Sequence, residues 1–129
     1  MSGLDLDLLG QPLAVCRFAP LDPVPSWAAG DLVSVTRTTE ELSVVCAADA
    51  VPIGTRVEGP FRALSVRGPL EFALTGVLLS LAAPLADAGV PIFVLSTYDT
   101  DVVMVPGHRV AAAVVALEDA GHHVHGGPT

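Results

Sequence analysis

The chain has 129 residues, of which 51% are hydrophobic, and a formal net charge of −8 at pH 7. This length suits one compact domain or two very small modules, and the acidic balance argues against nucleic acid and anionic membranes, because both bind basic clusters. The acidic N-terminus lacks the basic region of a signal peptide, and no apolar run approaches the ~20 residues of a membrane span. We therefore expect a cytoplasmic protein that binds neither nucleic acid nor a membrane.

The first half of the chain, residues 12–60, is predicted to consist of short strands joined by proline-rich turns. Strands are expected at Leu13–Phe18, Asp31–Arg37 and Leu42–Ala47. Three prolines between Ala19 and Ala29 exclude a long helix there, and Asp49–Gly59 reads as a loop because it holds one proline and two glycines. Residues 1–11, before this half, read as an acidic lead-in with frayed ends.

The second half, residues 61–125, carries longer periodic segments and is followed by a tail at residues 126–129. The predicted elements are a strand at Phe61–Arg67, a helix at Glu71–Ala88, buried strands at Ile92–Leu95 and Val102–Val105, a helix at Gly107–Ala120 and a short strand at His122–His125. The first helix should end at Gly89, where a left-handed cap is favourable, and Pro91 prevents its continuation. The order β-α-β-β-α-β predicts a ferredoxin-like α+β fold, with an antiparallel sheet and both helices on one face.

The first half repeats this order if its two helices are reduced to proline-rich turns. The chain would then hold two tandem modules, of which the one at residues 12–60 is degenerate and the one at residues 61–125 is complete. The strand at Phe61–Arg67 could close the first module and begin the second.

Cysteine and histidine side chains are the candidates for metal binding or redox chemistry. Cys16 and Cys46 each lie in an apolar run, and the chain has no CxxC motif, so both are expected to be buried thiols. The histidines are His108, His122, His123 and His125. Strand alternation would place His123 and His125 on one face, as a metal site requires, but no cysteine or carboxylate pair stands near them. A solvated terminal segment is the favoured interpretation, and no metal or cofactor is expected.

A polar segment, Ser96–Asp101, separates the two buried strands of the second half. It has the sequence STYDTD, and it follows PLADAGVPIFVL. Together with GPLEFALTG and the earlier ELSVVC, this pattern resembles small bacterial ACT-domain proteins and the ACT domains of the CASTOR family of arginine sensors. The resemblance covers roughly residues 12–124, and it implies tandem ACT-like modules that bind a free amino acid.

The resemblance also implies where the amino acid would bind. By position, the candidate ligand-binding residues are Thr97, Tyr98, Asp99, Asp101, Leu74, Thr75 and Gly76. Carboxylates here could hold an ammonium group, and backbone N–H groups could hold a carboxylate. Leu74 stands where the arginine sensors have an acidic residue, which favours a neutral or smaller amino acid. The alternatives are a hairpin turn that satisfies its own backbone and, at Gly76, close packing of helix on sheet.

Sequence motifs of catalysis are absent. The chain has no GxSxG, P-loop or GxGxxG motif. We therefore expect a non-catalytic homodimer that binds a free amino acid as a regulatory or sensing ligand at a module or dimer interface. The alternative is a ligand-free dimerisation or protein-interaction module, with an unidentified protein partner. A small enzyme that uses the carboxylates of the polar segment is a third, weaker option.

Overall fold

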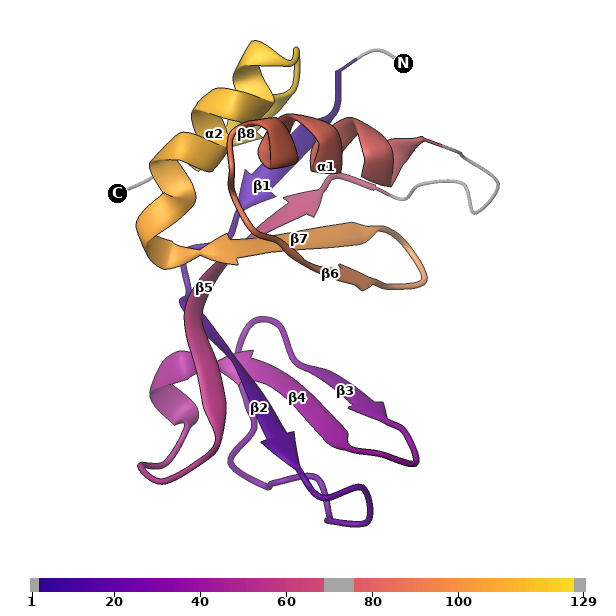
Figure 1. Cartoon of the computed structure of the whole chain (residues 1–129), viewed down its shortest axis with the longest axis vertical. Helices are drawn as coiled ribbons and strands as arrows, with labels where there is room; N and C mark the ends of the chain where they lie inside the picture. The colour runs from indigo at the N-terminus through magenta and orange to yellow at the C-terminus, as the bar shows by residue number, and fades with distance from the viewer. Residues whose placement is uncertain (1–2, 69–75, 127–129) are drawn as a thin grey trace. The chain divides into compact units, whose positions relative to one another are not determined.

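The computed structural model describes residues 3–68 and 76–126 (Figure 1). Its elements are β1 (Asp5–Leu8), β2 (Leu13–Phe18), β3 (Ser34–Arg37), β4 (Leu42–Ala47), the 3₁₀ turn η1 (Ala48–Ala50), β5 (Val57–Val66), α1 (Val77–Asp87), β6 (Phe93–Ser96), β7 (Asp101–Pro106), the 3₁₀ turn η2 (Gly107–Arg109), α2 (Val110–Asp119) and β8 (His123–His125). The chain divides into unit 1, Met1–Gly10 with Arg62–Thr129, and unit 2, Gln11–Phe61.

Unit 2 is built from antiparallel strands and a small core. β4 lies between β2 and β3, and β2 also pairs with the first part of β5. One buried cluster consists of Ala14, Cys16, Leu42, Val44 and Cys46, with Phe18, Trp27, Ala28, Ala48 and Val51 packed against it. Among the described residues of this unit the only helical segment is the three-residue turn η1, in agreement with the prediction that proline prevents a long helix.

The two cysteines of unit 2 are buried free thiols, as predicted. Cys16 pairs with Val44 in the register of β2 and β4, so Cys16 and Cys46 are diagonal neighbours. Burial raises the pKa of Cys16 to about 11 and raises the pKa of Cys46 as well.

Unit 1 has the predicted ferredoxin-like α+β order, with two helices on one face of its strands (Figure 1). Alternate residues of three strands pack with both helices in a single core. Its members are Leu6 and Leu8 of β1, Leu64 and Val66 of β5, Val103 and Val105 of β7, Leu81 and Leu85 of α1, Val110, Ala113, Val114 and Leu117 of α2, and Val90. Because side chains of a strand alternate between faces, this set places α1 and α2 on the same face.

The strand β1 corrects the expectation that residues 1–11 are an acidic lead-in with frayed ends. Asp5–Leu8 pairs antiparallel with β5 and parallel with β8, so the strands of unit 1 form a mixed arrangement and not the purely antiparallel one expected. Leu6 and Leu8 are buried in the core, while Asp5 and Asp7 alternate with them. This period of two is that of a half-buried strand, and the burial of both leucines stabilises the pairing.

Other features of the structure also differ from the predictions. β5 begins at Val57, within the stretch that was expected to be a loop. α1 begins at Val77, because Gly76 has a left-handed φ of 81° and stands outside the helix; the preceding part of the predicted helix, residues 71–75, lies outside the described residues. β6 is half-buried and not buried as expected. Gly89, with a φ of 72°, follows the C-terminal end of α1 as predicted. Among the described residues, no helix has the length and apolar character that a membrane span requires.

Candidate functional site

The predicted polar segment is the turn between β6 and β7. Thr97 Oγ1 donates to the carbonyl of Thr100 at 3.1 Å and accepts from its N–H at 3.2 Å, and the Thr97 N–H bonds the same carbonyl at 2.8 Å. Ser96 donates its hydroxyl to Asp101 Oδ1 at 2.8 Å across the register pair that these residues form. Thr97 and Asp101 therefore hold the turn together, which is the alternative role that the sequence left open.

A cavity of about 490 Å³ adjoins one side of this turn. It is lined by Asp7, Ser65, Val66, Arg67, Gly68, Asp99 and Thr100. Three parts of unit 1 meet there: β1 supplies Asp7, the end of β5 supplies Ser65 and Val66, and the turn supplies Asp99 and Thr100. Thr100 Oγ1 donates to the carbonyl of Val66 at 2.7 Å, which fixes the turn against β5.

The positive charge of this cavity is held by a two-pronged ion pair. Arg67 Nε lies 3.1 and 3.0 Å from the two carboxylate oxygens of Asp7, and Nη2 lies 2.9 Å from Oδ1. This hydrogen bonding lowers the pKa of Asp7 and raises that of Arg67. Within the described part of the chain, Nη1 has no hydrogen-bond partner, so it remains able to donate to a ligand.

The second charge of the cavity that is open to a ligand is the carboxylate of Asp99. Asp99 is exposed, and no ion pair or hydrogen bond to its carboxylate is present among residues 3–68 and 76–126. Ser65 and Thr100 add hydroxyl groups beside it. The cavity therefore presents a guanidinium, a carboxylate and neutral hydrogen-bonding groups within one small volume.

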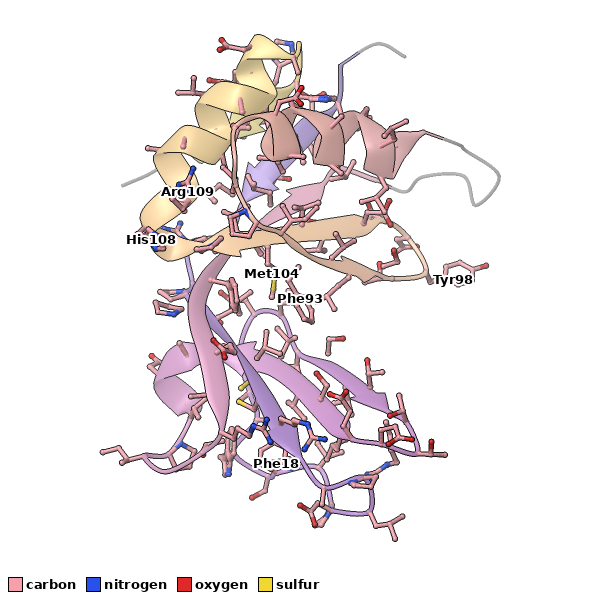
Figure 2. All side chains as sticks on the ribbon, viewed as in Figure 1. Phe18, Phe93, Tyr98, Met104, His108 and Arg109 are labelled. Atoms are coloured by element: carbon pink, nitrogen blue, oxygen red, sulfur yellow. The ribbon has the colours of Figure 1, made fainter. Side chains whose placement is uncertain are left out.

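The structure separates the residues that the sequence grouped together. Asp99 lines the cavity, whereas Thr97, Tyr98 and Asp101 do not. Tyr98 is 81% exposed at the tip of the hairpin, where it points away from the strands (Figure 2). Leu74 and Thr75 lie outside the described residues, and Gly76 stands at the N-terminal end of α1 without lining the cavity.

Sequence reasoning missed Asp7, Ser65 and Arg67. The alternation of aspartate and leucine at Asp5–Leu8 was the available signal, since it indicates a strand with one polar face. The pairing of that strand with the end of β5 then brings Asp7 opposite Ser65 and beside Arg67.

The histidines do not assemble into a site. Among the described residues, no group of three His, Cys, Asp or Glu side chains could hold a metal ion. His122 corrects the interpretation of a solvated terminal segment, because it is buried: its Nδ1 accepts from the Leu4 N–H at 3.0 Å, and its Nε2 lies 2.9 Å from the carbonyl of Ser80. Nε2 must then carry the proton, and the ring, which lies just before β8, links the residue before β1 to α1. His125, which is exposed, pairs with Asp5 at 3.0 Å and lowers the pKa of that carboxyl.

Comparisons with known proteins place this geometry in a family. The family model of the ACT domain matches residues 56–119, and a second model, described as an N-terminal domain, matches residues 12–53. A search of curated proteins finds no match. The predicted resemblance to ACT-domain proteins is confirmed, while the narrower likeness to the CASTOR arginine sensors stays a prediction.

Solved structures extend the comparison over the whole chain. A protein from Agobacterium tumefaciens is 35% identical with a TM-score of 0.89, and the match covers 96% of this chain and 93% of that one. A Vibrio cholerae protein is 19% identical with a TM-score of 0.77 over 92% of this chain and 91% of that one. The regulatory subunit of aspartate kinase from Thermus flavus is 15% identical with a TM-score of 0.62, over 92% of this chain and 97% of that one. The Vibrio cholerae and Thermus flavus structures show likeness of fold alone. This chain therefore belongs to the family of the Agobacterium tumefaciens protein, and its residues 56–119 match the model of the ACT domain.

Proposed function

We propose that this protein binds a free amino acid as a regulatory ligand and has no catalytic activity of its own. One observation carries the proposal: the cavity of about 490 Å³ offers a guanidinium and a separate carboxylate within an ACT domain. ACT domains typically serve as regulatory binders of amino acids, and the similar fold of an aspartate kinase regulatory subunit is consistent with such a role.

The chemistry of an amino acid matches the two charges of the cavity. Its α-carboxylate would accept hydrogen bonds from Nη1 of Arg67, which is held in place by its two-pronged pair with Asp7. Its α-ammonium group would donate to Asp99, and the hydroxyls of Ser65 and Thr100 would complete the polar shell. The prediction from sequence gave the ammonium group to the carboxylates of this turn, and the proposal assigns it to Asp99.

The regulatory effect would follow from the position of Asp7. Because β1 carries Asp7 and β5 leads into Arg67, a ligand on Arg67 contacts two strands that are distant in sequence. A ligand shifts the protein toward the arrangement of these strands that binds it better. The affinity of a partner for the protein would change through that shift. Binding at a module or dimer interface, a homodimeric state and an unidentified protein partner remain part of the proposal.

A thermal-shift screen of the purified protein against the common amino acids tests this function. A ligand present at roughly 100 times its dissociation constant should add about 2.7 kcal/mol to the free energy of unfolding. We expect Asp99→Asn to raise the dissociation constant of any such ligand by about tenfold or more, because a hydrogen bond to a charged group contributes roughly 1.5–3 kcal/mol. Titration calorimetry measures that difference.

Asp101→Asn is the matched control, since Asp101 lies in the same turn but does not line the cavity. It should leave the dissociation constant unchanged. If no amino acid at millimolar concentration stabilises the protein, the proposal is wrong, and the alternative of a ligand-free dimerisation or protein-interaction module is favoured. A ligand whose affinity falls with Asp101→Asn and not with Asp99→Asn would place the site elsewhere on the turn.

A further inference from the structure

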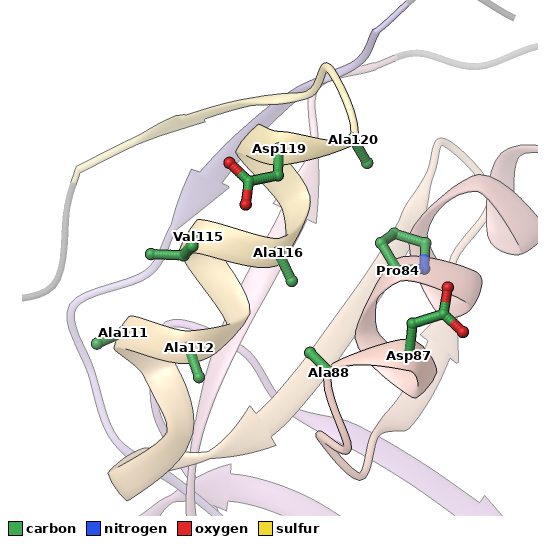
Figure 3. A pocket seen from close by; sticks show the side chains of 9 residues that line it. All are labelled: Pro84, Asp87, Ala88, Ala111, Ala112, Val115, Ala116, Asp119 and Ala120. Atoms are coloured by element: carbon green, nitrogen blue, oxygen red, sulfur yellow. The ribbon is translucent and has the colours of Figure 1, made fainter.

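An apolar groove lies between α1 and α2 in unit 1 (Figure 3). It has a volume of about 730 Å³ and is lined by Pro84, Asp87, Ala88, Ala111, Ala112, Val115, Ala116, Asp119 and Ala120. Apart from Ala116, which also packs against the core, these residues differ from the ones by which the two helices pack onto the strands. The groove therefore belongs to the face of the helix pair that is not used for the core of unit 1.

The groove exists because its side chains are small. Ala112, Ala116 and Ala120 follow one another at steps of four residues on α2, so they form one row along the helix. In Figure 3 this row points toward Pro84 and Ala88 of α1. Side chains that end at Cβ leave the space between two helices unfilled, and a large apolar side chain from outside could occupy it.

The apolar surface of the groove is exposed to solvent. Val115 is 59% exposed, and Ala88, Ala111 and Ala112 are exposed as well. Burial of such surface by a partner removes apolar area from water and so stabilises a complex.

The charges of the groove select the partner. The carboxylate of Asp87 on α1 and that of Asp119 on α2 line the groove, and no basic side chain is among its lining residues. All six cationic side chains of the protein are arginines. The nearest in sequence, Arg109, is directed to the end of α1, where it donates to the carbonyls of Gly89 and Ala88.

These charges argue against a second copy of the chain as the occupant. In a two-fold dimer the same patch meets itself, so both pairs of aspartates would enter one interface with no basic side chain among its lining residues. A partner that carries lysine or arginine beside large apolar residues would instead be complementary to the groove. An amphipathic helix supplies that pattern at spacings of three and four residues.

We propose that the α1–α2 groove is a docking surface for a basic amphipathic helix of another protein. The proposal does not depend on the amino-acid cavity, which is formed by residues of β1, β5 and the β6–β7 turn. If both hold, the protein would have a ligand site and a separate partner surface within the same unit.

Two synthetic helical peptides of about 18 residues, or five turns, would test this surface. They share one leucine face and differ only in a polar face of lysine or of glutamate. We expect the lysine peptide to bind the full-length protein saturably with one site, as measured by titration calorimetry, and the glutamate peptide not to bind. Asp87→Asn combined with Asp119→Asn should weaken the lysine peptide about tenfold or more, because it removes the charges that face the partner.

Filling the groove provides the second arm of the test. Ala112→Trp should also weaken the lysine peptide about tenfold or more, since it occupies the space that the partner side chain would take. Ala86→Trp is the matched control, because Ala86 is an exposed alanine of α1 that does not line the groove. Circular dichroism confirms that each variant is folded.

Equal affinity for the two peptides, or unchanged affinity in Ala112→Trp, would overturn the proposal. It would also be overturned if sedimentation showed a dimer of the wild type that Ala112→Trp dissociates and Ala86→Trp does not, since the groove would then serve a second copy. Saturable binding that requires both an open groove and the two aspartates would establish it.

Discussion

The two units use strands of similar length and differ in what covers them. In unit 1, two α-helices contribute Leu81, Leu85, Val114 and Leu117 to a core that reaches three strands. In unit 2, the described residues supply only a 3₁₀ turn and irregular segments, and the cluster that these segments cover has five buried members, two of them cysteines. The difference shows that a face of a sheet can be closed either by a periodic helix or by proline-rich segments that place single side chains on it.

The composition of the covering segments explains the difference. Proline at positions 20, 23 and 25 removes backbone donors and fixes φ, so the segment between β2 and β3 cannot form a helix. Trp27 packs against the core from that segment, with its ring centroid 6.0 Å from that of Phe18. An aromatic pair thus helps to cover the core of unit 2, where unit 1 uses helices.

The comparison would be tested most severely by removing one large side chain from each core. We expect Leu85→Ala in unit 1 and Leu42→Ala in unit 2 each to lower the free energy of unfolding by about 2–5 kcal/mol, because both leucines are fully buried. Far-ultraviolet circular dichroism follows the helices of unit 1, and fluorescence of Trp27, the only tryptophan, follows unit 2. Urea titrations with both probes measure the effects.

If the units are separate in stability, each substitution should shift mainly the probe of its own unit. Identical shifts of both probes for both substitutions would show one cooperative transition, and the units would then differ in architecture but not in stability.

The buried histidine of unit 1 should have the next largest effect. His122→Ala removes the acceptor of the Leu4 N–H and the donor to the Ser80 carbonyl, which we expect to cost about 1–3 kcal/mol. Hydrogen exchange of the β1 amides should accelerate more than that of β7. His123→Ala is the control, because the neighbouring His123 is exposed and should be replaceable with little effect. Unchanged exchange of β1 in His122→Ala would show that the histidine does not hold this strand.

The smallest expected effects are those of pH on stability. The direction of the pH change that lowers stability should differ between the two units. The hydrogen bond from Arg67 lowers the pKa of Asp7 in the folded state. The contribution of Asp7 to stability is therefore present above pH 3.8, the ordinary pKa, and is lost as the pH falls through the lower pKa of the folded state. Cys16 has a raised pKa, so its contribution is fully present below 9.0 and is lost as the pH rises through about 11. Unit 1 should therefore lose stability in acid and unit 2 in alkali.

The two probes described above measure this difference in urea titrations across the pH range. Asp7→Asn should reduce the loss of stability in acid that is measured by circular dichroism. Cys16→Ala should reduce the loss of stability in alkali that is measured by Trp27 fluorescence. If the free energy of unfolding depends on pH in both variants as it does in the wild type, other groups set that dependence.

The sequence alone predicted the order of elements from Phe61 onward, because helices and strands have different periods and both are visible in the pattern of apolar residues. It predicted β4 to the residue, and it predicted the C-terminal end of α1 from Gly89. It also predicted the absence of a long helix in the proline-rich part of unit 2. The degenerate relationship of residues 12–60 to the complete module stays a prediction.

Only the tertiary structure decided the place of the N-terminal strand and the membership of the cavity. A strand of four residues carries too little periodicity to stand out from a polar lead-in, and its partners β5 and β8 are distant in sequence. The register of that pairing, Leu6 opposite Val66 and Asp7 opposite Ser65, is what brings Asp7 to Arg67. Long-range pairing depends on which faces can be buried together, and the local sequence of neither segment contains that information.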